Sequence, residues 1–278
     1  MFARLAIITA GLLVVILCLS CAGCVHHNTL AQRNASFSVY EDAKLGPESV
    51  RQYLIRRSGI LCDAESFDTT SLSTNSFRFN AKKAAYGTVT AIDQRGYFLT
   101  AAHCVENSQI WVAFLRDDKL QMERARIVWR GAEKKGEPDL ALLCVSRPLT
   151  QTFEWAAEFT NGSPVVDLGL RVDEHPLALK PQCVAGWVLK ASERSSKDSL
   201  DYTVVCHSSP LRRGDSGGPL VLSDGRLLGI NIGWRADFQW SHLSFERVHG
   251  EAHRPDLAWL RKVIDADAAL FSREASSP

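Results

Sequence analysis

The sequence predicts an all-β domain that ends in a helix, and three observations support this fold class. Between residues 84 and 234 the apolar residues fall into short runs that alternate in the manner of strands. Polar segments rich in turn residues, such as 93–96 and 223–226, separate these runs. Near the end of the chain the period becomes helical, and one face carries four apolar residues: Leu257, Leu260, Ile264 and Ala268.

The first half of the domain begins with a short helix and continues as strands. Proline at the first turn and Gly59 as a stop signal predict a helix from Pro47 to Arg57. Residues 63–83 are rich in Ser, Thr, Asn and Asp and are expected to form a loop. The pattern then predicts strands at 87–92, 97–100, 110–115, 124–129 and 140–145.

The second half follows a linker near residues 148–164. Strands are expected at 165–170, 182–189, 202–206, 219–222 and 227–232, and the charged segment 191–199 is expected to be an exposed hairpin. The turn at 223–226 predicts that the last two of these strands form an antiparallel pair. The final helix is expected over about 255–270, and residues 272–278 are expected to fray.

The segment Gly214-Asp215-Ser216-Gly217-Gly218-Pro219 is the most informative motif. A serine hydroxyl is a poor nucleophile at neutral pH, so it needs a neighbouring base and donors for the oxyanion that forms on attack. Glycines allow a sharp turn that exposes the serine side chain and directs backbone N–H groups into one cavity. We therefore expect Ser216 to be a nucleophile, with the N–H groups of Gly214 and Ser216 as oxyanion donors.

Two upstream segments complete a resemblance to a known family. Thr-Ala-Ala-His-Cys contains His103, and Asp139 opens the apolar run Asp-Leu-Ala-Leu-Leu. With the Ser216 motif, they resemble the signatures of chymotrypsin/trypsin-like serine peptidases, in the order His, Asp, Ser. The spacings of 139 − 103 = 36 and 216 − 139 = 77 residues suit that family. The resemblance covers residues 84–234.

The resemblance implies a double barrel and a reaction. The expected fold is two six-stranded antiparallel β-barrels, the first at about 58–147 and the second at about 160–250, within a peptidase domain at 58–271. His103 would act as the base, Asp139 would orient it, and Ser216 would attack the peptide bond through an acyl-enzyme intermediate. Protein or peptide substrates are expected, without a metal or cofactor. His242, His249 and His253 are loosely spaced and show no metal-ligand pattern.

Three positions are candidates for the substrate pocket. Pro210 stands six residues before Ser216, where digestive members of the family place the pocket base, so an acidic residue selecting Lys or Arg is absent there. Asn231 and Gly233 lie in the expected pocket wall. The order Asn-Ile-Gly-Trp differs from that of digestive enzymes and is closer to HtrA-type bacterial members.

The family resemblance leaves two structural questions open. Cys183 and Cys206 could bridge two strands of the second barrel, and Cys62 is the upstream candidate to pair with Cys104. The sequence has no Ile-Val-Gly-Gly activation site before the domain, so Asp215 is expected either to find another partner or to remain solvated.

The first 24 residues resemble a bacterial lipoprotein signal. Residues 5–19 are almost wholly apolar but too short for a comfortable membrane span, and Ala22-Gly23-Cys24 follows. Cys24 is the expected lipidation site, with Cys21 as the competitor and a signal anchor or an ordinary signal peptide as further alternatives. Residues 25–57 would be a tether and short helix, and the protein would be exported and held at the cell envelope by its lipid.

Composition excludes some functions but not all. The chain is 46% hydrophobic and 23% charged, with a formal net charge of +1, so no basic surface suggests nucleic acid. About 250 residues after the signal leave room for one double-barrel domain. The alternative to an enzyme is a non-catalytic lipoprotein that uses the same scaffold to bind peptides.

Overall fold

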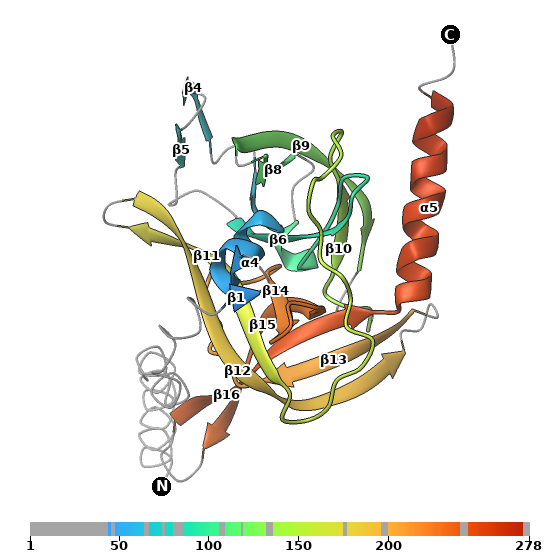
Figure 1. The fold of residues 1–278 in the computed structure, drawn as a ribbon. Helices are drawn as coiled ribbons and strands as arrows, with labels where there is room; N and C mark the ends of the chain where they lie inside the picture. Colours follow the sequence, from blue (N-terminus) through green and yellow to red (C-terminus); the bar gives the residue numbers. More distant parts are fainter. Residues whose placement is uncertain are drawn as a thin grey trace, which may run out of the picture.

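Two closed antiparallel barrels make up the protein (Figure 1). The structure is a computed structural model that describes residues 44–45, 48–63, 67–73, 76–79, 86–105, 109–117, 119–131, 136–174, 177–195, 200–239 and 244–274. The prediction of two six-stranded antiparallel barrels followed by a helix is confirmed. The predictions for residues 1–43, including the signal and Cys24, and for residues 275–278 lie outside the described residues.

The first barrel closes in the order β10-β7-β6-β3-β8-β9. Its strands are β3 (Ser58–Asp63), β6 (Tyr86–Asp93), β7 (Tyr97–Thr100), β8 (Ile110–Arg116), β9 (Lys119–Arg130) and β10 (Ala141–Cys144). Alternate side chains of these strands point inward and fill one apolar core. Its buried members include Leu61, Val89, Phe98, Val112 and Leu143.

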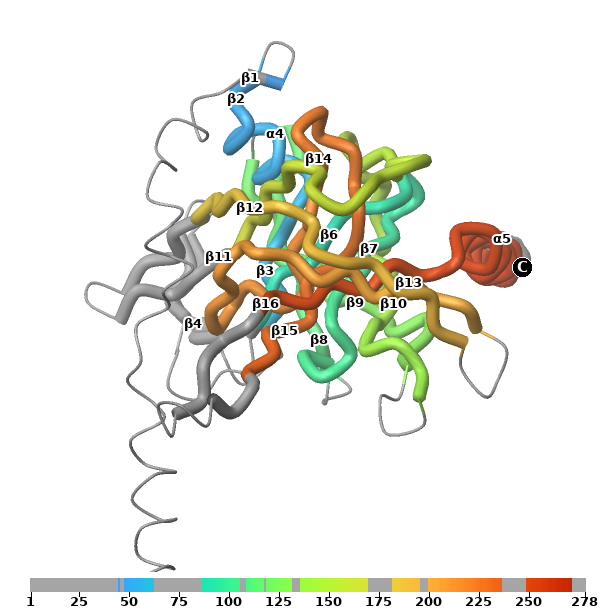
Figure 2. The backbone as a smooth tube through the Cα atoms, turned by 90° about the horizontal axis from the view of Figure 1, so that it is seen from below, coloured from blue at the N-terminus to red at the C-terminus, as the bar shows by residue number. Residues whose placement is uncertain are grey.

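The second barrel closes in the order β11-β12-β13-β16-β15-β14. Its strands are β11 (Pro164–Glu174), β12 (Leu177–Ser195), β13 (Asp201–His207), β14 (Pro219–Leu222), β15 (Leu227–Gln239) and β16 (Ser244–Pro255). The tube view in Figure 2 follows these strands as they cross beside the first barrel. The motif that precedes β14 lies at the junction of the barrels, because the Thr88 N–H of β6 donates to the Ser216 carbonyl.

The sequence missed strands at each end of the domain. Gly59 was expected to stop a helix, but it lies within β3, where a Cβ would stand 2.7 Å from the Ala113 carbonyl oxygen of β8. β16 was missed because its sequence is polar. The expected loop 63–83 contains a hairpin of β4 (Phe67–Ser73) and β5 (Ser76–Phe79). The expected hairpin at 191–199 is in part a continuation of β12.

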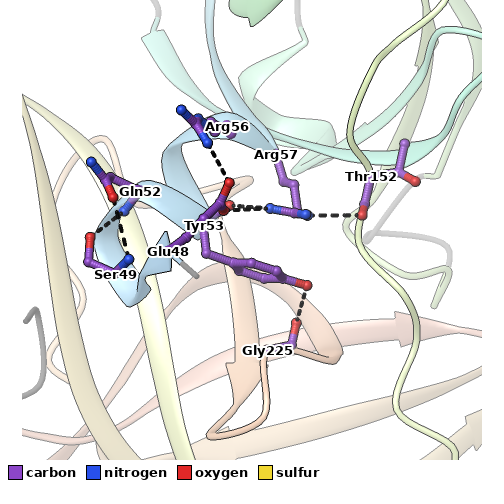
Figure 3. A network of polar contacts seen from close by, with 8 residues as sticks. All are labelled: Glu48, Ser49, Gln52, Tyr53, Arg56, Arg57, Thr152 and Gly225. Atoms are coloured by element: carbon purple, nitrogen blue, oxygen red, sulfur yellow. Dashed lines mark hydrogen bonds and ion pairs between the residues drawn. The ribbon is translucent and has the colours of Figure 1, made fainter. Parts of the chain in front are cut away.

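A short N-terminal helix joins the two barrels (Figure 3). It is α4 (Val50–Arg56), preceded by the small strands β1 (Lys44–Leu45) and β2 (Glu48–Ser49). Ser49 and Gln52 form a capping box, so the helix starts three residues later than the predicted Pro47. The Tyr53 hydroxyl donates to the Gly225 carbonyl in the β14–β15 turn, and Arg57 donates to the Thr152 carbonyl in the linker between the barrels.

The C-terminal helix packs on the first barrel. α5 (Leu257–Glu274) buries Leu260 and Ile264, while Arg261 and Lys262 face solvent, as predicted. The Tyr97 hydroxyl of β7 donates to Asp267 at 2.8 Å, which ties the helix to the strand that leads to His103. In the described part of the chain, no helix is long and apolar enough to cross a membrane.

The proposed bridge between Cys183 and Cys206 is wrong. Cys206 pairs with Lys190 in the β12–β13 ladder, and Cys183 lies seven residues before Lys190. Seven residues of strand span about 23 Å, far beyond the reach of a disulfide. Cys62 and Cys104 likewise carry thiols in this structure.

Candidate active site

His103 and Asp139 come from the same edge of two paired strands. His103 lies in the short 3-10 helix η2 (Ala102–Cys104), just after Thr100 at the end of β7. Asp139 lies just before Ala141 at the start of β10, and Ala141 pairs with Thr100. Since the two strands are antiparallel, the chain leaves one and enters the other at the same edge. This register brings together side chains 36 residues apart in sequence.

The imidazole and the carboxylate form a closely bonded pair. His103 Nδ1 lies 2.6 Å from Asp139 Oδ2, and the His103 backbone N–H donates to Asp139 Oδ1 at 2.9 Å. Asp139 is only 5% exposed, whereas the His103 side chain is 46% exposed. A carboxylate that accepts from Nδ1–H leaves Nε2 with the lone pair, so the solvent-facing nitrogen is the one able to accept a proton.

The two groups shift each other's pKa in opposite directions. The hydrogen bond to Asp139, followed by contact with Cys104, raises the pKa of His103 above its ordinary value despite partial burial. Burial alone would raise the pKa of Asp139, but the hydrogen bonds and charge of His103 outweigh it and hold that pKa below its usual range. Asp139 is therefore ionised at neutral pH, and the pair favours an imidazolium next to it.

A second histidine supports Asp139 from the other barrel. The Asp139 backbone N–H donates to His253 Nδ1 of β16 at 3.0 Å. Burial lowers the pKa of His253 to about 4, so its ring is neutral at physiological pH and can accept this bond. No role was predicted for His253, because nothing in its local sequence indicates a contact 114 residues away.

The loop that carries Ser216 has the backbone that its glycines predict. Gly214 and Gly217 have φ values of +97° and +86°, in the left-handed region that favours glycine. A Cβ at Gly217 would also lie 1.9 Å from the Thr88 carbonyl oxygen. Both constraints require glycine here, and Ser216 is exposed in part between them.

Threonines of β6 fasten this loop to the first barrel. The Thr88 hydroxyl donates to the Gly214 carbonyl at 2.7 Å, and the Thr90 hydroxyl donates to the Gly217 carbonyl at 2.9 Å. Between them, the Thr88 N–H donates to the Ser216 carbonyl at 2.8 Å. The backbone on both sides of Ser216 is thus fixed relative to the barrel that holds His103.

Gly87 shows how closely the two halves of the site approach. A Cβ at Gly87 would stand 2.9 Å from Cys104 Sγ, next to His103, and 3.0 Å from the Ser216 carbonyl oxygen. The Ser216 hydroxyl itself donates to the Ile232 carbonyl at 3.4 Å. Within the described chain it has no hydrogen bond to His103, so the two candidate catalytic side chains are not aligned with each other in this structure.

Two backbone donors beside Ser216 are available. The N–H groups of Asp215, Gly217 and Gly218 donate to carbonyls of Arg212, Asn231 and Asp215. Among the described residues, the N–H groups of Gly214 and Ser216 have no such acceptor. These are the two donors that the sequence indicated for an oxyanion.

Asp215 was expected either to find another partner or to remain solvated, and the structure shows that it is buried. It is 1% exposed, and its carboxylate accepts from the Arg212 backbone N–H at 2.7 Å. A Cβ at Gly169 of β11 would collide with this carboxylate, so glycine is required where the side chain enters the second barrel. The aspartate has thus found a partner without a cleaved N-terminus.

Comparison with known proteins agrees with this arrangement. The model of the trypsin-like peptidase domain family matches residues 87–230, a span that includes His103, Asp139 and Ser216. The chain belongs to this family. No curated protein matches the chain.

Two solved structures resemble the peptidase in fold. One is the apo form of the MamO protease domain from Magnetospirillum magneticum, with a TM-score of 0.52 and 17% identity over 77% of this chain and 98% of that one. The other is the HtrA-type protease AlgW with a tripeptide, with a TM-score of 0.50 and 19% identity over 76% of this chain and 60% of that one. The double-barrel fold suggested by the sequence is therefore confirmed.

The three predicted pocket positions of the peptidase have different environments. Pro210 and Gly233 are half-buried, and Gly233 precedes Trp234, which is 47% exposed. Asn231 is fully buried, and its backbone bonds to the Ser216 loop through Gly217 N–H and the Gly218 carbonyl. Asn231 thus positions the loop with its backbone, while its side chain points into the barrel.

His207, which lies beside Asn231, could not be recognised from the sequence. Burial, together with the charge of His249, lowers the pKa of His207 to about 3, although the Asn231 side chain opposes these effects. Among the described residues, neither ring nitrogen of His207 has a partner that meets hydrogen-bond geometry, and the same is true of the amide of Asn231. These two side chains are therefore polar and uncharged at neutral pH.

Proposed function

We propose that this peptidase-family protein is a serine endopeptidase that uses Ser216, His103 and Asp139. The main support for this proposal is the 2.6 Å contact between His103 and the buried Asp139. The Ser216 loop lies next to this pair and is fixed to the same barrel by Thr88. A base held in one tautomer, beside a serine on a rigid glycine turn, is the arrangement that activates a hydroxyl.

The reaction follows from these positions. Rotation about χ1 moves the Ser216 hydroxyl from the Ile232 carbonyl toward His103 Nε2, which takes its proton as Oγ attacks the substrate carbonyl. The N–H groups of Gly214 and Ser216 stabilise the oxyanion. The imidazolium, stabilised by Asp139, then protonates the leaving amine, and water hydrolyses the acyl-enzyme by the same route.

Labelling with a fluorophosphonate probe tests the proposal, because the probe reacts only with an activated serine. The full chain should be labelled, while Ser216→Ala and His103→Ala should not. Ser223→Ala, at an exposed serine in the β14–β15 turn, is the matched control and should label normally. A folded full chain that resists the probe would instead favour the non-catalytic peptide-binding alternative, with which the present Ser216–Ile232 hydrogen bond is also compatible.

We further propose that cleavage follows small or medium apolar residues. A Lys or Arg side chain would lose its hydration without gaining a fixed counter-charge at Pro210. Asn231 and His207 add no charge behind the pocket wall at neutral pH. A peptide-library profile tests this, and a dominant preference for Lys or Arg at the cleaved bond would contradict it.

We also propose export and lipid anchoring through Cys24, on the strength of the Ala22-Gly23-Cys24 segment after an apolar run. Cys24→Ser should then release the protein from the membrane fraction and abolish palmitate incorporation. One acyl chain alone binds membranes marginally, so full release is expected when the lipidation site is lost. Loss of label in Cys21→Ser but not in Cys24→Ser would move the site to Cys21.

A further inference from the structure

Three side chains with metal-ligating atoms meet on the second barrel, outside the proposed catalytic site. They are Cys206 of β13 and His249 and Glu251 of β16, and their ligand atoms all lie within 4.8 Å of one another. We propose that this cluster binds a divalent transition metal such as Zn²⁺. The proposal does not depend on whether Ser216 is catalytic.

Strand register brings the cluster together. Cys206 pairs directly with Glu251 across the β13–β16 ladder, two strands that lie side by side in Figure 1. His249 precedes Glu251 by two residues and therefore shares its face of the sheet. The spacing of the histidines alone could not reveal this cluster, because one ligand comes from a strand 43 residues earlier (249 − 206).

The local geometry fits a tetrahedral ion. His249 Nε2 lies 3.2 Å from Glu251 Oε1. Zinc–nitrogen and zinc–oxygen bonds of about 2.0–2.1 Å at a tetrahedral angle place two such atoms about 3.3 Å apart. Thiolate, imidazole and carboxylate are also the donor types that zinc takes in proteins.

Next to the cluster, one position of the sheet is open. Gly233 of β15 pairs with Glu251 on the side opposite Cys206, so the three residues form one row across the sheet. A Cβ at Gly233 would meet no atom within 4 Å. Three protein ligands with an open position are typical of sites that hold water or an exchangeable ligand, whereas purely structural zinc sites are closed.

The surrounding charges are compatible with an ion at this position. A Cys206 thiolate and the Glu251 carboxylate together balance a divalent cation, and the thiol proton leaves to solvent on binding. Arg235 lies 3.8 Å from Glu251, but its side chain is 64% exposed and can move into water at little cost.

Cobalt titration of the full chain tests the site, because a thiolate ligand gives Co²⁺ a charge-transfer band in the near ultraviolet. Residues 18, 21 and 24 are also cysteines, so the reference protein and every variant in this experiment carry serine at these three positions. Cys206→Ser should abolish the band, and Cys144→Ser, at a half-buried cysteine of the first barrel, should preserve it. Zn²⁺ should displace the bound cobalt.

A second variant separates binding from folding. Loss of a group that only orients a metal ligand costs about 10–100-fold in metal affinity. Since His249 is proposed as a ligand itself, His249→Gln should weaken Co²⁺ binding at least about 100-fold while the thermal melt stays unchanged. An unchanged band in Cys206→Ser, or an unchanged affinity in His249→Gln, would overturn the proposal.

Discussion

The two barrels contribute unequally prepared halves of the candidate active site. In the first barrel, His103 and Asp139 are already joined through both carboxylate oxygens. In the second, the backbone around Ser216 is equally fixed, yet its hydroxyl contacts Ile232 at 3.4 Å. The fold therefore fixes the backbone of the candidate nucleophile, while its hydroxyl makes a hydrogen bond that catalysis would have to break. Catalytic hydrogen bonds often tighten only when substrate is bound.

The largest effect on activity should come from a substitution in the His103–Asp139 pair of the first barrel. Asp139→Asn should reduce kcat about 10⁴-fold, the loss seen in the serine peptidase template, because the amide favours the wrong tautomer of His103. Hydrolysis of a peptide ester measures the rate, and a thermal melt reports the fold. Asp224→Asn, at an exposed aspartate in the β14–β15 turn, is the control. Near-normal activity of Asp139→Asn would show that the pair is not catalytic.

The contacts between the barrels should matter next. Thr90→Val keeps the side-chain shape but removes the hydroxyl that donates to the Gly217 carbonyl. An unsatisfied buried carbonyl costs about 1–3 kcal/mol, so we expect kcat/KM to fall roughly tenfold or more as the Ser216 loop loosens. Thr203→Val, at a half-buried threonine of β13, is the matched control. Equal activity of the two variants would show that the loop is held without Thr90.

The same contrast explains how much the sequence could predict. Ser216, His103 and Asp139 were found because each lies in a local motif whose backbone requirements are visible in the sequence, such as the glycines beside Ser216. Five strands of the first barrel, β6 to β10, followed from alternation in the same way, whereas β3 did not. Local patterns therefore indicated the candidate catalytic residues and the fold class.

Features that depend on contacts between distant strands were not predictable. β16 reads as a polar segment, because its apolar neighbours come from β13 and β15. His253 and His207 acquire their roles only when this strand and its partners close the barrel. The barrel closure also placed Cys206 opposite Glu251 and far from Cys183, which excluded the proposed disulfide.

The pH dependence of activity should reveal the prepared pair directly. The base must be neutral to accept a proton, and Asp139 raises the pKa of His103 above the ordinary value of about 6.5. The imidazolium therefore persists to higher pH, and kcat/KM should fall as pH drops through that raised pKa, by roughly tenfold for each further unit. A pH–rate profile, together with NMR titration of His103, measures the shift. An acid limb at or below pH 6.5 would show that the pair is weaker than its geometry indicates.

The smallest effect should come from His253, which acts on the pair only through the Asp139 backbone. His253→Phe keeps a ring in place but removes the Nδ1 acceptor and leaves the buried Asp139 N–H unsatisfied. We expect a several-fold loss of kcat with little change in KM, because substrate binding does not involve this bond.

A second substitution at this position distinguishes positioning from packing. His253→Asn restores an acceptor close to the place of Nδ1 while removing most of the ring, so it should recover kcat even if it lowers the melting temperature. A merely structural role predicts the opposite order, with the phenylalanine variant more active than the asparagine variant. Because burial lowers the pKa of His253 to about 4, the ring is neutral across the physiological range, and the loss in His253→Phe should be independent of pH between 6 and 8. That independence from pH would distinguish the contribution of His253 from the titration of His103.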